Sequence, residues 1–355
     1  MGTWDIFCRV VDNHGDLGVC WRLAVDLAER GETPRLWVDN DSALRWMAPF
    51  GHPGVELIRW QEPLAERVPG DVVIEAFGCE LPAMFVQRMA QRAPAPCWIN
   101  LEYLSAEAYV ERSHGLPSPQ LAGPAAGLRK WFFYPGFTPR TGGLLREPGL
   151  LERRAAFDRD AWLASRGCAL RGGERAVSLF CYEQPAMHEW LRALARQPTL
   201  LLTTGGHAAR QVTAALGPSL VLGQLRVSVV EPLTQPEYDQ LLWASDLNIV
   251  RGEDSFVRAQ WAGAPFVWHI YPQRDGAHRA KLEAFLDRFL HSAEPALAGS
   301  VRAMMRAWSD GAASPEPWPD LAAWRRHCLA WRSELAAQDD LATQLLRFTA
   351  ERRLK

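Results

Sequence analysis

The stretch WDIFCRVVDNHGDLGVCWRLAVDLAER, residues 4–30, carries the pattern that decides the fold. It opens with a mostly apolar run, which predicts a buried strand over residues 4–11. Apolar side chains then recur at helical spacing at Val19, Leu23 and Leu27, which predicts a helix over residues 19–30. A buried strand that leads through a short polar loop into a helix is the repeating unit of proteins with parallel sheets.

The same alternation continues along the rest of the chain. Further strands of the first half are predicted over residues 35–38, 55–58, 72–76, 98–101 and 130–134. A Pro- and Gly-rich stretch and a helical pattern over residues 150–166 follow, and we interpret Gly172-Gly173 as a linker. Strands of the second half are predicted over residues 177–180, 199–203, 225–230, 247–250 and 265–269, and from residue 276 the pattern is helical, interrupted only at residues 309–319.

Two blocks of alternating strands and helices around one linker predict two Rossmann-like domains that face each other across a cleft. We expect an N-terminal domain over residues 1–165, a C-terminal domain over residues 174–330 and a final helix over residues 331–355. Ligands of such sheets bind at the carboxyl ends of the strands, where the strand order reverses, so chemistry is sought in the loops that follow strands.

The composition narrows the class of protein further. The chain has 355 residues, and its 39 Lys+Arg and 41 Asp+Glu give a net charge of -2, so no basic field favours nucleic acid or a membrane surface. The seven cysteines form no CxxC pair, which predicts buried, reduced thiols rather than a zinc site. No 18-residue apolar run and no signal peptide are recognisable. We therefore expect a soluble cytoplasmic protein.

The loop after the first strand is the first candidate for chemistry. It places Asp12, Asn13, His14, Gly15 and Asp16 between a strand and a helix. The loop lacks the GxGxxG pattern of dinucleotide-binding folds, and two carboxylates suit the binding of a cation or the removal of a proton from a nucleophile. Alternatively, Asp16 caps a helix that begins near residue 17. Capping explains one aspartate but not both.

The second candidate is NIVRGEDSF, residues 248–256, where a buried strand ends and a helix begins. The free N–H groups of a helix N-terminus suit a diphosphate, and Arg251 can add a charge-assisted hydrogen bond. Alternatively, Glu253 and Asp254 are ordinary first-turn residues that pair with Arg251.

Aromatic residues mark further candidate positions. Phe180 and Tyr182 lie in SLFCYE, at the end of the first strand of the second block, where a ring can stack on a nucleobase or simply pack in the core. Gln235 and Tyr238 begin a helix and have the same two interpretations, and Tyr271 follows a buried strand. Neither GxxxxGK[ST], GxSxG nor HExxH occurs, which argues against a P-loop NTPase, an α/β-hydrolase and a zincin.

Three of these segments together resemble the bacterial EarP family of protein-arginine rhamnosyltransferases. They are FCRVVDNHGDLG at residues 7–18, SLFCYE at residues 178–183 and NIVRGEDSF at residues 248–256. The resemblance extends over residues 5–285 and implies a GT-B fold. It further implies transfer of rhamnose from dTDP-β-L-rhamnose, with inversion and without a metal or other cofactor, onto one arginine of translation elongation factor P.

The resemblance also implies roles for individual residues. The catalytic carboxylates correspond to Asp16, Asp12 and Glu253. The residues expected to bind dTDP-rhamnose are Asn13, His14, Gly15, Phe180, Tyr182, Gln235, Tyr238, Arg251, Asp254, Ser255 and Tyr271. A guanidinium is a poor nucleophile because it stays protonated and delocalised, so a carboxylate that binds it and accepts its proton makes chemical sense of the acidic loop.

Two alternative functions remain open on the sequence. One is a GT-B enzyme whose acceptor is a lipid or another small molecule, which is expected to present an apolar acceptor surface or a basic patch in the first half. The other is a protein that binds a nucleotide sugar without turnover.

Overall fold

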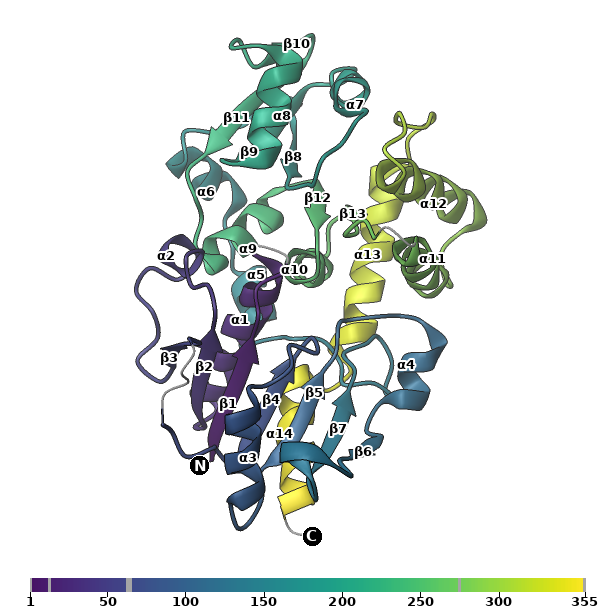
Figure 1. The fold of residues 1–355 in the computed structure, drawn as a ribbon. Helices are drawn as coiled ribbons and strands as arrows, with labels where there is room; N and C mark the ends of the chain where they lie inside the picture. The colour runs from purple at the N-terminus through teal and green to yellow at the C-terminus, as the bar shows by residue number, and fades with distance from the viewer. Residues whose placement is uncertain (1, 12–13, 62–65, 274–275, 354–355) are drawn as a thin grey trace. The chain divides into compact units, whose positions relative to one another are not determined.

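The computed structural model describes residues 2–11, 14–61, 66–273 and 276–353, and it divides into two compact units. The first unit comprises Met1–Pro148 and Leu335–Lys355, and the second comprises Gly149–Glu334 (Figure 1). The boundary thus lies before the predicted linker Gly172-Gly173. The last helix is part of the first unit because Leu341 and Leu345 pack into that unit's core.

The first unit is built on a sheet of strand order β3-β2-β1-β4-β5-β7-β6. Only β6 runs antiparallel to its neighbour. The bounds are β1 (Thr3–Cys8), β2 (Thr33–Val38), β3 (Glu56–Arg59), β4 (Val72–Ala76), β5 (Cys97–Leu101), β6 (Pro117–Pro119) and β7 (Arg129–Phe133). Its helices are α1 (Gly15–Glu29), α2 (Leu44–Met47), α3 (Ala83–Gln91), α4 (Ala108–Ser113) and α14 (Leu341–Arg353), with a 3₁₀ turn at Gly123–Ala125.

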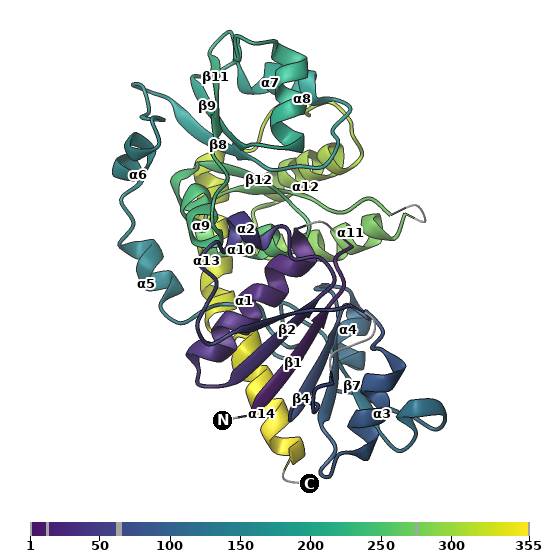
Figure 2. The ribbon, with the colours of Figure 1, turned by 60° about the vertical axis from the view of Figure 1, so that its left-hand side comes forward.

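Both faces of this sheet are covered, as a parallel sheet requires. Successive residues of β1 point to opposite faces, so Ile6 and Cys8 pack in the core with α1 and α14, whereas Phe7 packs on the other side with Phe85 of α3. Figure 2 shows α1 running along the strands of this sheet.

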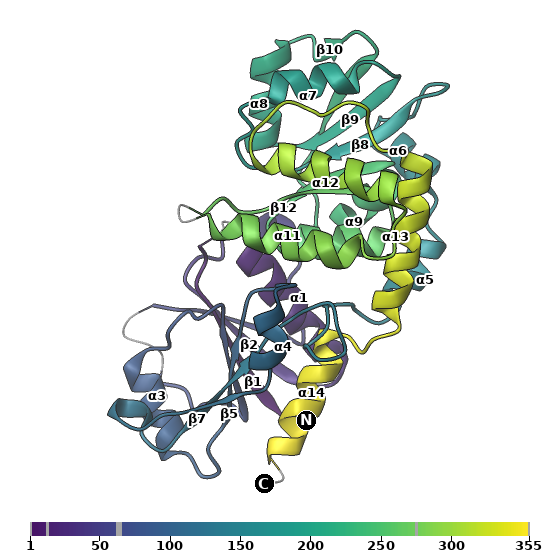
Figure 3. The same ribbon diagram turned by 90° about the vertical axis from the view of Figure 1, so that its right-hand side faces the viewer.

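The second unit repeats this architecture with the strand order β10-β11-β9-β8-β12-β13. The bounds are β8 (Arg175–Leu179), β9 (Thr199–Thr204), β10 (Val221–Leu222), β11 (Leu225–Val230), β12 (Leu247–Arg251) and β13 (Phe266–His269). Its helices are α5 (Leu150–Ala155), α6 (Arg159–Ser165), α7 (Met187–Leu194), α8 (His207–Leu216), α9 (Gln235–Ala244), α10 (Asp254–Ala262), α11 (Ala277–Phe289), α12 (Pro295–Ser309) and α13 (Leu321–Ala336). Helices α11 and α12 lie side by side (Figure 3), joined by ion pairs from Arg302 and Arg306 to Glu283.

Two local expectations need correction. The helical pattern over residues 150–166 forms two helices, α5 and α6, because Asp158 accepts a hydrogen bond from the N–H of Ala161 at 3.0 Å and so begins a new helix. The first helix begins at Gly15 rather than at residue 19, which leaves a shorter loop after β1.

The strand order reverses once in each sheet, between β1 and β4 and between β8 and β12. The loops that follow these strands are therefore the expected ligand-binding loops. The predicted segments after β1, β8 and β12 lie at these two points. All seven cysteines are free and buried, as expected from their sequence context.

Candidate functional site

The loops after β8 and β12 form the first part of the candidate site. The N–H of Phe180 donates to the carbonyl of Ile249 at 2.8 Å, which extends the pairing of the two strands by one residue. Earlier in the same two strands, the buried Ser178 hydroxyl donates to Asn248 Oδ1 at 2.6 Å. Phe180 and Arg251 are thereby held next to each other, although they lie far apart in the sequence.

The guanidinium of Arg251 lies over two aromatic rings. Its Cζ is 4.4 Å from the ring centroid of Phe180 and 4.6 Å from that of Tyr182, both within the range of cation–π interactions. Its Nη1 also approaches the carbonyl of Cys181 at 3.4 Å. These contacts orient a positive charge at the carboxyl ends of β8 and β12.

Other predicted aromatic residues join this group. Tyr182 packs edge-to-face against His269 at 5.2 Å and against Tyr271 at 5.3 Å between ring centroids, and Phe180 packs against Tyr238 at 5.8 Å. Tyr271 remains 47% exposed and Tyr182 is partly buried, so part of the cluster is accessible to a ligand. We call Phe180, Tyr182, Tyr238, Arg251 and Tyr271 the aromatic–arginine cluster.

The turn between β12 and α10 is held by hydrogen bonds between side chains and its backbone. Gly252 has a φ of 62°, a left-handed conformation that favours glycine, and its carbonyl accepts a hydrogen bond from Trp268 Nε1 at 2.7 Å. The hydroxyl of Ser255 accepts from the Arg251 N–H at 3.1 Å and donates to the Arg251 carbonyl. Glu253 is the N-cap residue of α10, and Asp254 lies in its first turn. The turn thus sets the direction of the α10 N-terminus.

Helix α9 supports the cluster from the side. It begins with a capping box between Thr234 and Glu237, and the buried Gln235 is its first helical residue. Asp239 of α9 and Arg258 of α10 form a buried two-pronged ion pair, with Nε–Oδ1 at 2.9 Å and Nη2–Oδ2 at 2.7 Å. This pair holds together the two helices that carry the predicted residues Gln235, Tyr238, Asp254 and Ser255.

Asp16 of the first unit is buried at the second position of α1. Its Oδ2 accepts the N–H of Val11 at 2.9 Å, and its Oδ1 accepts the hydroxyl of Tyr103 at 3.3 Å. The N-cap residue is His14, so the alternative in which Asp16 caps a helix starting near residue 17 is wrong. Gly15 begins the helix. The predicted residues Asp12 and Asn13 lie outside the described residues.

Sequence reasoning missed Tyr103. It lies two residues after the end of β5 and stacks on Phe77 with 4.4 Å between ring centroids and an interplanar angle of 14°. Phe77 has a φ of 57°, which is uncommon for a residue with a side chain and marks a locally constrained loop after β4. The signal that could have indicated Tyr103 is its place at the carboxyl end of a central strand.

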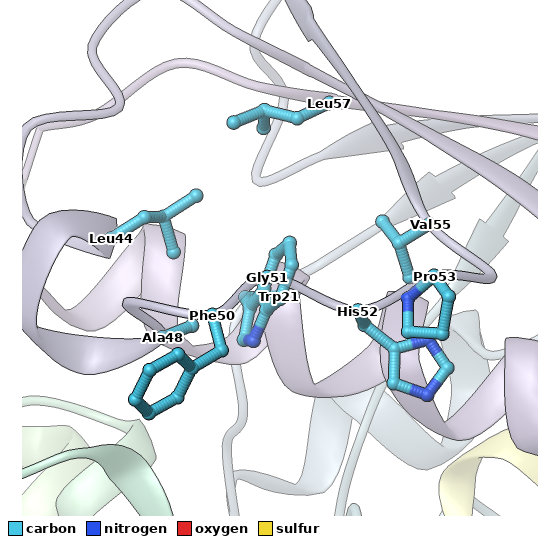
Figure 4. Close-up of a pocket in the computed structure, with 9 residues that line it drawn as sticks. All are labelled: Trp21, Leu44, Ala48, Phe50, Gly51, His52, Pro53, Val55 and Leu57. Atoms are coloured by element: carbon cyan, nitrogen blue, oxygen red, sulfur yellow. The ribbon is translucent and has the colours of Figure 1, made fainter.

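A cavity of about 350 Å³ also lies in the first unit (Figure 4). It is lined mainly by apolar residues between α1 and β3, including Trp21, Leu44, Phe50 and Leu57. None of the predicted site residues lines it.

Within the described residues, no group of three or more His, Cys, Asp or Glu side chains could hold a metal ion, and no helix is long and apolar enough to span a membrane.

His269 provides a prediction of pH dependence. Burial and the nearby Arg251 lower the pKa of His269 from 6.5 to about 3, so the folded state keeps the ring neutral. Below pH 6.5 the ring takes up a proton in the unfolded state but not in the folded state. The contribution of His269 to the free energy of unfolding is therefore complete above pH 6.5 and is lost as the pH falls toward the folded pKa. When the pH falls from 6.5 to about 5, the free energy of unfolding of the wild type should fall by about 2 kcal/mol more than that of His269→Phe, which lacks the titrating ring.

Urea denaturation at both pH values measures this difference. The exposed His188 gives a matched control, because His188→Phe leaves the buried ring in place and should follow the wild type. Equal acid sensitivity of the wild type and His269→Phe contradicts the prediction.

Comparison with known proteins defines the class to which this architecture belongs. The family model described as "Elongation-Factor P (EF-P) rhamnosyltransferase EarP" matches residues 4–350. A protein-arginine rhamnosyltransferase of Pseudomonas aeruginosa is 47% identical, with 99% of this chain and 100% of the relative covered. One of Neisseria meningitidis is 35% identical, with 98% of this chain and 96% of the relative covered.

Solved structures agree with this result. A structure that describes EarP-mediated arginine glycosylation of translation elongation factor EF-P superposes with a TM-score of 0.67 at 34% identity, and 99% of each chain is covered. The spinosyn rhamnosyltransferase SpnG, solved with thymidine diphosphate, has a TM-score of 0.54 at 13% identity, covers 98% of this chain and 99% of its own, and supports the fold alone.

These findings confirm the predicted fold class, an α/β glycosyltransferase of the GT-B type. The protein is therefore an enzyme of that class. Within it, the chain belongs to the EarP family of rhamnosyltransferases, as the resemblance implied.

Proposed function

We propose that this enzyme transfers rhamnose from dTDP-β-L-rhamnose, with inversion, onto one arginine of translation elongation factor P. The observation that carries the proposal is the position of the Arg251 guanidinium over Phe180 and Tyr182, at the reversal of strand order in the second sheet. Membership of the EarP family supports the rhamnose, the arginine and the acceptor protein.

The second unit binds the donor in this proposal. The rings of the aromatic–arginine cluster offer surfaces on which the thymine can stack. Arg251 and the N-terminus of α10, at Asp254 and Ser255, face the diphosphate with positive charge and free N–H groups. Gln235 contributes a polar side chain at the start of α9.

The first unit supplies the carboxylate that acts on the acceptor. Asp16 hydrogen-bonds the arginine and accepts the proton that the attacking nitrogen releases, with Asp12 in support. The nitrogen forms a bond to the anomeric carbon through an oxocarbenium-like state while the bond to the diphosphate breaks. Glu253 holds the sugar or supports the acidic site. The products are dTDP and the rhamnosylated arginine.

Protein groups stabilise the leaving group without a metal in this proposal. Charge develops on the departing diphosphate, and preorganised donors stabilise such charge strongly because they need no reorganisation. The buried, free cysteines support a reducing compartment, so we also propose that the reaction takes place in the cytoplasm.

The direct test incubates the enzyme with dTDP-β-L-rhamnose and purified elongation factor P. We expect mass spectrometry to find one added deoxyhexose on a single arginine. No mass gain on intact elongation factor P contradicts the proposed acceptor and leaves the two alternative functions. Release of dTDP with a lipid or small glycoside then distinguishes another acceptor from a binding protein without turnover.

Arg251 makes a separate prediction about donor affinity. Arg251→Ala removes a charged hydrogen-bond donor and the contact that holds the two rings, so we expect the dissociation constant of dTDP to rise about 10- to 100-fold. Isothermal titration calorimetry measures the change. The exposed Arg171 gives the control, because it precedes β8 and Arg171→Ala removes the same charge at the end of that strand opposite to the cluster. An unaltered dissociation constant in Arg251→Ala rules out the phosphate contact.

A further inference from the structure

The segment between Phe180 and Gln184 carries two rings of the proposed donor site after the regular pairing of β8 has ended. Gln211, on α8, contacts this segment through both ends of its side-chain amide. Its Nε2 donates to the carbonyl of Tyr182 at 2.9 Å, and its Oε1 accepts the N–H of Gln184 at 2.7 Å. The Nε2 also lies 3.8 Å from Cys181 Sγ.

These contacts reproduce one rung of a β-ladder. The carbonyl of Tyr182 and the N–H of Gln184 flank Glu183 on the same side of the backbone, and a neighbouring strand would pair with both. The side-chain amide of Gln211 takes the place of that strand. Both its donor and its acceptor are used, so only an amide of this length satisfies the two backbone groups together.

Two further contacts hold the ends of the segment, and Arg251 Nη1 approaches the carbonyl of Cys181 between them. Phe180 is bonded to β12 through its N–H, and the buried Gln184 side chain donates to the carbonyl of Trp308 at 2.9 Å. Between these two ends, Gln211 contacts the backbone of Tyr182, whose ring lies 4.6 Å from the Arg251 guanidinium. The backbone position of Tyr182, and hence the direction of its ring, depends on this amide.

We infer that Gln211 is a positioning residue for donor binding, which sets the backbone that carries Tyr182 without touching the reacting atoms. The inference rests on the proposed function, because it assumes that Tyr182 contacts the nucleotide. It predicts a selective effect: the binding of the nucleotide weakens, while the chemical step and the binding of the acceptor protein are retained.

The test compares Gln211→Met, which keeps the length but loses both hydrogen bonds, with the wild-type enzyme. We expect the dissociation constant of dTDP and the KM for dTDP-rhamnose to rise about 10-fold, consistent with two hydrogen bonds of ordinary strength. We expect kcat and the KM for elongation factor P to stay close to wild type. A general loss of structure would lower kcat and the melting temperature instead.

Two further variants complete the design. Gln211→Glu keeps the acceptor for the N–H of Gln184 but replaces the donor to the Tyr182 carbonyl with a second acceptor. It should therefore weaken dTDP binding as well. This variant replaces Gln211→Met in the test if Gln211→Met does not fold. Gln224→Met is the matched control, because Gln224 Nε2 donates to the carbonyl of Arg196 at 3.1 Å at an exposed site.

The outcomes separate the inference from the proposed function. If wild-type enzyme binds no dTDP, the proposed donor is wrong. If the wild type binds dTDP and either Gln211 variant that folds binds it equally well, the positioning role is wrong. Donor and acceptor KM values that rise together with a fall in kcat also overturn it.

Discussion

Asp16→Asn is expected to reduce the rate of rhamnosyl transfer by about 10²- to 10⁴-fold, the range for the loss of a general base. Asparagine has nearly the same volume. Its carbonyl can still accept the N–H of Val11, which now bonds Oδ2 at 2.9 Å, and its NH2 group can donate to the hydroxyl of Tyr103, which now bonds Oδ1 at 3.3 Å. The change therefore removes the negative charge and the ability to take a proton, with little change in packing.

Two measurements test this prediction. The initial rate of mass gain on elongation factor P reports turnover. Calorimetry with dTDP reports nucleotide binding, which should be largely retained because Arg251 and the rings proposed to bind the nucleotide belong to the second unit. Asp41→Asn is the control, because Asp41 makes an exposed ion pair with Arg59 in the same unit. If Asp16→Asn transfers rhamnose at the wild-type rate, Asp16 is not the general base.

Arg258→Ala is expected to lower the free energy of unfolding of the second unit by about 3–5 kcal/mol, the usual cost of removing one partner of a buried ion pair. The side chains of Arg258 and Asp239 are 2% and 6% exposed, so the substitution leaves the aspartate charge in a buried place. Because this pair joins α9 to α10, we also expect weaker binding of dTDP.

Urea denaturation of the full chain measures the loss of stability. Arg306→Ala is a matched control: Arg306 contacts Glu283 with the same two-pronged geometry, at 2.5 Å and 2.7 Å, but its side chain is 52% exposed. Exposed pairs contribute about 0–1 kcal/mol, so this variant should unfold near the wild-type midpoint. Similar losses in the two variants show that burial of the Arg258 pair does not matter.

Much of the candidate site could be predicted because it follows the ends of strands. The segments after β8 and β12 each follow an apolar run, and they supply Phe180, Tyr182 and Arg251 of the aromatic–arginine cluster, which Tyr238 and Tyr271 complete. Tyr103 and Gln211 were missed for opposite reasons. Tyr103 stands in a strand-end loop without a motif, and Gln211 lies inside an amphipathic helix where its sequence neighbours give no sign of a role.

The sequence by itself determined the alternation of strands and helices and the loops in which polar and aromatic residues gather, because both follow from the local spacing of apolar side chains. Only the tertiary structure decided that β8 lies beside β12, that Tyr103 in the loop after β5 reaches Asp16 across 87 residues of chain, and that the last helix packs in the first unit. The reason is physical: strand order and side-chain hydrogen bonds between distant residues depend on how the elements pack, and local periodicity contains no information about that.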